Sequence, residues 1–184
     1  MDKSPVPIRF ELPSADWRPV DAEALGVTNA LFFAARTGPE GDTSDLDGFT
    51  PTLSVSGGWR ADGASMTAIA DESVAKLRAE GADEVELVRR RVVDSDTAPA
   101  VSQTIGAVAT IDGQRYDLRQ TQAVFGYVDL EHPDRVAVLV HTLTHTFKQE
   151  PEMVEEFRAY LESIEVAPGE DPGAAPTTDP SEGA

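Results

Sequence analysis

Two histidines in the C-terminal half, His141 and His145, have a spacing that is often associated with metal binding. Four residues apart on an α-helix, two imidazoles lie on one face and can chelate zinc. Here the segment 141–146 reads HTLTHT, a threonine-rich pattern that favours a β-strand. Positions four apart on a strand are separated by roughly 13 Å, which one metal ion cannot span. We therefore predict two histidines on a sheet face and no metal site.

An acidic loop, residues 37–50, resembles the calcium-binding loop of an EF-hand. It carries four carboxylates and no basic residue. When Gly48 is aligned with the glycine of such a loop, the first ligand position is Thr43 and the twelfth is Ser54. The bidentate glutamate required at the twelfth position is therefore missing. We predict a solvated loop without a calcium site.

Sequence motifs of the common catalytic folds are absent from the chain. It contains no G-x-S-x-G elbow, no P-loop and no G-x-G-x-x-G fingerprint. It also contains no cysteine, which excludes disulfides, thiolate metal sites and a cysteine nucleophile. We predict a protein that is not an enzyme, with no catalytic residue and no cofactor.

Two amphipathic helices are predicted from apolar residues that recur every three to four positions. The first covers 64–80, and Gly81 is expected to end it. The second covers 151–164, and its proline in the first turn is compatible with a helix start. Between the helices the chain is rich in valine, threonine and isoleucine, which favour strands. Strands are expected at 6–12, 29–36, 52–56 (ended by Gly57 and Gly58), 84–94, 101–111, 114–128 and 135–147.

The dipeptide Asp112-Gly113 predicts a two-residue hairpin turn, which fixes the register of the strands on either side. Ile111 then pairs with Gln114, and the core face carries Val101, Ile105 and Val124 together with Gln120. The opposite face is semi-polar, with space beside its arginine at Gly106. If the longer turn near His132 and Pro133 is symmetric, His145 lies opposite Arg119 on this face, and His141 lies there too. We expect this face to bind a protein partner through an acidic group, more tightly as the pH falls and histidine becomes charged. Its residues are Thr104, Thr121, Arg119, His141 and His145.

The charge of the 184-residue chain is strongly negative, at −18, and unevenly distributed. Residues 148–184 carry ten acidic side chains against two basic ones. Nucleic acid and anionic membranes are therefore not expected as partners, because both require a basic surface. No apolar run is long enough to span a membrane, and the N-terminus lacks the apolar core of a signal peptide. We expect a cytoplasmic protein.

The last residues differ in composition from the rest of the chain. From 168 to 184 the chain is acidic, rich in proline and glycine, and has no large apolar side chain. Such a segment cannot bury enough surface to offset its ordering entropy. We predict one α+β domain over residues 1–167 and a disordered acidic tail over 168–184.

Four short motifs resemble the Mog/PsbP-like superfamily, and together they span roughly residues 8–166. They are the opening Phe10-x-Leu12-Pro13-x3-Trp17, a helix that ends in Leu77-Arg-x-x-Gly81, the hairpin Gln103…Asp112-Gly113…Leu118-x-Gln120-x-Gln122, and a closing Phe157-x3-Leu161-x2-Ile164. Within this superfamily the chain resembles the bacterial LpqN-like and DcrB-like members. It differs from the LpqN-like lipoproteins because it has no cysteine for lipid attachment. The resemblance implies an α/β/α sandwich around an antiparallel sheet and a non-enzymatic adaptor, assembly or chaperone role.

Two classes of function remain open at this point. The first is a protein-binding module, an adaptor or chaperone whose partner is another protein or a second copy of the chain in a homodimer. The alternative is a small-ligand carrier or enzyme with a pocket between helix and sheet. An enclosed apolar cavity favours the alternative, and an exposed groove favours the binding module.

Overall fold

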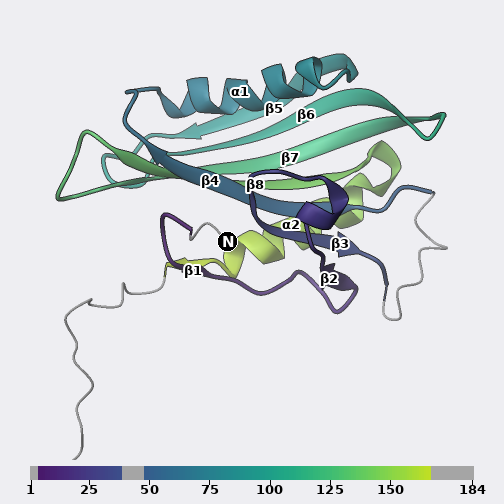
Figure 1. Ribbon diagram of the computed structural model, residues 1–184, viewed down its shortest axis with the longest axis horizontal. Helices are drawn as coiled ribbons and strands as arrows, with labels where there is room; N and C mark the ends of the chain where they lie inside the picture. The colour runs from purple at the N-terminus through teal and green to yellow at the C-terminus, as the bar shows by residue number, and fades with distance from the viewer. Residues whose placement is uncertain (1–3, 39–47, 167–184) are drawn as a thin grey trace, which may run out of the picture.

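A seven-stranded antiparallel sheet forms the centre of the protein in a computed structural model, which describes residues 4–38 and 48–166 (Figure 1). Two short strands near the two ends of the domain pair in a separate two-stranded sheet. They are β1 (Ile8–Arg9) and β9 (Glu165–Val166). In spatial order, the large sheet consists of β2 (Trp17–Pro19), β3 (Ala30–Arg36), β4 (Thr52–Arg60), β8 (Val136–Thr146), β7 (Gln114–Val128), β6 (Ala100–Ile111) and β5 (Asp83–Val93).

The β6–β7 hairpin has the predicted register. Asp112 and Gly113 both have positive φ, at 50° and 81°, as the two central residues of a type I′ turn require. Ile111 pairs with Gln114, and Gly106 lies opposite Arg119. The hairpin prediction is confirmed. It could be made from the sequence because the turn chemistry and the strand alternation are both local properties.

Two helices cover opposite faces of the sheet (Figure 1). Helix α1 (Met66–Ala79) begins at Ser65, whose hydroxyl accepts a hydrogen bond from the Ala68 N–H, and Gly81 follows its end with φ 88°. A single 3-10 turn, η2 (Phe147–Gln149), leads into helix α2 (Glu150–Glu162). The sheet between helices confirms the predicted α+β class and its α/β/α layers.

A separate apolar core lies under each helix. On the α1 side, Ile69 and Ala70 pack against Val101, Val124 and Val138. The core on the α2 side is larger and includes the N-terminal segment. It contains Trp17, Ala34, Leu53, Val55, Ala123, Leu143, Met153, Phe157 and Tyr160.

Several short elements of the structure differ from the sequence predictions. The expected strand at 6–12 is reduced to Ile8–Arg9. Strands β2 and β9 and the 3-10 turn η1 (Glu23–Leu25) were not predicted, since each has two or three residues and carries no periodic pattern of its own. The tail over 168–184 and residues 39–47 of the acidic loop lie outside the described residues. No helix in the described part of the chain is long and apolar enough to cross a membrane.

Strand β4 does not end at Gly57 and Gly58 but continues to Arg60. The two glycines have different surroundings. A Cβ on Gly57 would lie 2.0 Å from the Val138 backbone oxygen, so the glycine permits a close approach of β4 to β8. A Cβ on Gly58 would meet no atom within 4 Å.

Alanine at these two positions should therefore have different effects. We expect Gly57→Ala to lower the free energy of unfolding by roughly 1–3 kcal/mol, because the backbone must move to relieve the overlap. Gly58→Ala is the matched control and should change stability by less than about 0.5 kcal/mol. Urea unfolding of both variants measures the difference. Equal losses would contradict the close approach of β4 and β8.

Candidate binding groove between α1 and the sheet

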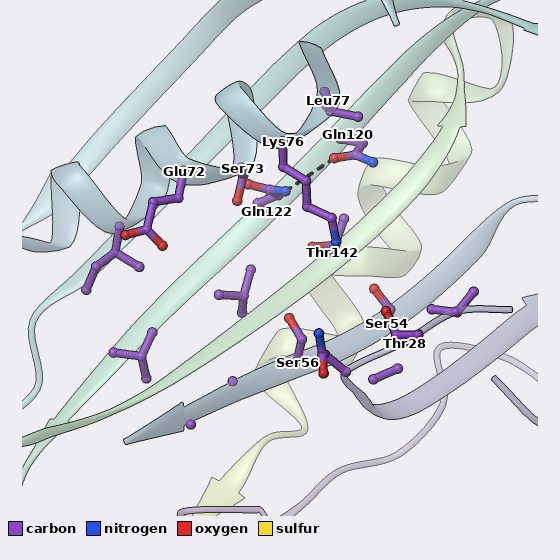
Figure 2. A pocket seen from close by; sticks show the side chains of 18 of the residues that line it. Thr28, Ser54, Ser56, Glu72, Ser73, Lys76, Leu77, Gln120, Gln122 and Thr142 are labelled. Carbon is purple, nitrogen blue, oxygen red and sulfur yellow. Dashed lines mark hydrogen bonds between the residues drawn. The ribbon is translucent and has the colours of Figure 1, made fainter. Parts of the chain in front are cut away.

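Helix α1 covers only part of its face of the sheet. It packs mainly on β5, β6 and β7 and reaches β8 only through the contact of Ile69 and Ala70 with Val138, so part of the same face of β4 and β8 is left open. The uncovered strip and the flank of the helix enclose a groove of about 390 Å³ (Figure 2). We call it the α1 groove.

The α1 groove is lined by strand residues below and helix residues at the side (Figure 2). The alternation of each strand places these floor residues on the α1 face. The floor consists of Ser54 and Ser56 of β4, Val138, Val140 and Thr142 of β8, and Gln120 and Gln122 of β7; the helix contributes Ile69, Glu72, Ser73, Lys76 and Leu77.

Opposite charges pair along the rim of the α1 groove. Arg60 contacts Glu72 at 2.7 Å and also Asp62, and Lys76 Nζ lies 3.7 Å from Glu80. The groove therefore has hydroxyl and amide groups on its floor and a charge-balanced rim. Such a surface suits a neutral, polar ligand rather than an ion.

A chain of hydrogen-bonded side chains runs beneath α1 and ends in the groove. Arg90 of β5 contacts Asp71 of α1 at 2.7 Å and donates to Gln103 of β6. Gln103, which is 2% exposed, donates to Gln122 over 2.8 Å, and Gln122 donates to Gln120 over 3.3 Å. The chain connects the outer strand β5 with the groove floor on β7.

The semi-polar face predicted from the hairpin lies on the other side of the sheet, beneath α2. The predicted neighbours are correct: Thr104 pairs with Thr121, and Arg119 pairs with His145. Arg119 is ion-paired with Asp117 at 2.7 Å, and its guanidinium stacks over a phenylalanine ring of η2. The structure thus brings the predicted residues onto one face.

Burial changes what the two histidines on this face can do. His141 and His145 are both 0% exposed, so neither can contact a partner while α2 is in place. The His141 Nδ1 atom lies 2.7 Å from the Tyr160 hydroxyl oxygen, and the His145 Nδ1–H donates to the Thr146 carbonyl over 2.8 Å. A direct partner contact on this face stays a prediction for Arg119, whose side chain is 15% exposed.

For His141, the expectation that the ring becomes charged in mild acid is wrong. Burial lowers the pKa of His141 to about 4, because the charged ring loses its hydration. Burial also lowers the pKa of His145. Within residues 4–38 and 48–166, no group of three His, Asp or Glu side chains is placed to hold a metal ion.

The α1 groove was not predicted from the sequence, although one signal pointed to it. Gln103, Gln120 and Gln122 occupy positions on the face that the hairpin register assigned to the core. Amide side chains at core positions indicate either a buried polar network or a boundary with solvent. Both explanations apply here, because Gln103 belongs to a buried polar network and Gln120 lines the groove at the boundary with solvent.

The comparisons with known proteins identify the fold. No protein-family model matches the chain, and no curated protein does. Among solved structures, LpqN of Mycobacterium tuberculosis, which is described as involved in cell envelope biogenesis, is similar with a TM-score of 0.56 and 12% identity over 91% of this chain and 88% of that one. Cyanobacterial PsbP (CyanoP) of Synechocystis sp. PCC 6803 is similar with a TM-score of 0.50 and 12% identity, over 88% and 94%.

At this level of identity the similarity establishes the fold alone. The chain has a PsbP/LpqN-like fold, as the sequence resemblance implied. Neither description names a catalysed reaction. Function must therefore be argued from the site of this chain.

Proposed function

We propose that this chain is a non-enzymatic protein-binding module whose recognition surface is the α1 groove. The groove receives an extended segment of a partner protein. The observation that carries the proposal is the groove itself, which is open to solvent, bordered by a helix and a strand, and lined by groups that can donate and accept hydrogen bonds.

The lining suits an extended peptide for two reasons. A peptide backbone needs partners for both its N–H and C=O groups, and serine, threonine and glutamine side chains can serve both. Between them, Ile69 of α1 and Val138 and Val140 of β8 offer apolar contacts to its side chains. The paired charges of the rim neither attract nor require an ionic ligand.

The second candidate is a small-ligand carrier that uses the same site. A volume of about 390 Å³ is within the range of small-molecule pockets. However, carriers bury most of the ligand surface, whereas this groove, which α1 and residues 27–30 border, is open to solvent. An adaptor or assembly role is the more specific form of the proposal, and the similarity to LpqN supports it only through the shared fold.

Filling the groove should weaken peptide binding without unfolding the protein. Peptides would be selected from a random phage-displayed library against the immobilised chain, and the affinity of the best one measured by fluorescence anisotropy. We expect Gly58→Leu to weaken binding at least about tenfold, since Gly58 lines the groove and its Cβ position is open.

The matched control is Ser102→Leu, which adds the same side chain at an exposed position of β6. It should leave the affinity unchanged. The proposal is overturned if no peptide can be selected, or if the selected peptide binds equally well to Gly58→Leu.

A further inference from the structure

We propose that the α1 groove selects a ligand that places a neutral carbonyl oxygen, such as a peptide C=O, against the amide nitrogen of Gln120. This inference rests on the proposed function of the groove and names the chemical group that the groove recognises. It follows from the direction of the hydrogen bonds in the chain from Arg90 to Gln120.

Arg90, at the β5 end of this series of hydrogen-bonded side chains, fixes the direction of the hydrogen bonds. A guanidinium can only donate hydrogen bonds, so the atom of Gln103 that receives them must be its oxygen. Arg90 Nε and Nη2 lie 3.0 and 2.6 Å from Gln103 Oε1. Asp71 holds the same Nη2 at 2.7 Å, which keeps the guanidinium in place.

Once the orientation of the Gln103 amide is fixed, the hydrogen bonds determine the orientations of the Gln122 and Gln120 amides. Its Nε2 donates to the Ala70 carbonyl over 2.9 Å and to Gln122 Oε1 over 2.8 Å. A backbone carbonyl only accepts, so the contact with Ala70 requires the same orientation of Gln103 as Arg90 does. Gln122 then presents its Nε2 to Gln120 Oε1, at 3.3 Å.

Gln120 is the last member, and its Nε2 remains as a donor at the groove floor. In Figure 2 the amide oxygen of Gln120 faces Gln122, and its nitrogen points away from that side chain. Among residues 4–38 and 48–166, this nitrogen donates no hydrogen bond to another protein group. A ligand that covers it without an acceptor would leave a buried donor unpaired, which weakens binding.

The acceptor is neutral rather than a carboxylate. Arg60 and Lys76 are the cationic residues that line the groove, and each already faces a carboxylate of Glu72 or Glu80. The net charge of −18 on the whole chain opposes the approach of an anion. A peptide carbonyl supplies the required acceptor without charge.

The orientation of the amides can be tested without any ligand. NOEs from the assigned side-chain amide protons in labelled protein should connect Gln103 Hε2 with Ala70, and Gln122 Hε2 with Gln120. In Gln103→Glu the new carboxylate only accepts, so Gln122 must turn its Nε2 toward position 103. Gln120 then donates to Gln122 and presents its oxygen to the groove. Wild-type protein with Gln120 Hε2 directed at Gln122 would overturn the inference.

The recognition step is tested with the peptide selected from the phage library. We expect Gln103→Glu, and Gln120→Glu, which presents an acceptor directly, to weaken its binding at least about tenfold. Gln114→Glu, at the exposed hairpin turn, introduces the same charge and should bind normally. Normal binding to Gln120→Glu would overturn the inference while leaving the groove as the peptide site. If no peptide is selected, the proposed function fails, and the NOEs still decide the orientation.

Discussion

Replacing Trp17 with alanine should lower the free energy of unfolding by about 3–5 kcal/mol, as is usual for a buried aromatic residue. Trp17 is 2% exposed and belongs to the core under α2. Its indole N–H donates to Glu156 Oε2 over 2.5 Å, so the substitution also leaves a half-buried carboxylate with one fewer donor. Urea unfolding at pH 7, followed by far-UV circular dichroism, measures the loss.

Two further variants separate packing from hydrogen bonding. Trp17→Phe keeps most of the apolar contact and loses the N–H together with part of the ring, so the expected loss is about 1–2 kcal/mol. The matched control is Trp59→Ala, because Trp59 is 49% exposed and stacks on Arg135 with a distance of 4.6 Å from the guanidinium carbon to the ring centre. Its loss should stay below about 1 kcal/mol. A similar loss for both tryptophans would contradict the assignment of Trp17 to the core.

The position of Trp17 explains why the start of the chain was harder to predict than its middle. Strands β5 to β8 were predicted nearly to the residue, because each is a long run of β-formers and one turn sets the register of the β6–β7 pair. The N-terminal segment has no such run. Its strand β2 exists because Trp17–Pro19 pairs with β3 and Trp17 packs against α2, which is more than a hundred residues away.

The same distinction applies to the candidate sites. Treating the longer turn near His132 and Pro133 as symmetric correctly placed Arg119 opposite His145, because cross-strand pairing depends on local alternation. How completely α2 covers a face is a tertiary property, and α2 buries most of the face that the sequence predicts to be semi-polar. The α1 groove depends on how far α1 sits from the middle of the sheet, which the periodicity of one helix does not encode.

Mild acid should destabilise the protein through its buried histidines. In the folded state the pKa of His141 is about 4, whereas the unfolded chain has the ordinary value of 6.5. As the pH falls below 6.5, the His141 ring binds a proton in the unfolded chain but not in the folded protein. The folding equilibrium therefore shifts toward unfolding. The full contribution is present above pH 6.5 and is lost progressively down to pH 4, at a cost of about 3 kcal/mol. His145, whose pKa is also lowered by burial, acts in the same direction.

Urea unfolding at intervals from pH 7 to pH 4 measures this loss, and histidine variants assign it. Carboxylates also titrate near the lower end of this range, so the informative quantity is the difference between wild type and variant at each pH. His141→Gln removes the titrating ring, retains a polar group toward Tyr160, and should flatten the profile between pH 6.5 and 4. His132→Gln removes a histidine whose side chain is 58% exposed and should leave the profile as steep as in the wild type. A profile of unchanged slope in His141→Gln would mean that the buried ring is not the group that couples folding to pH.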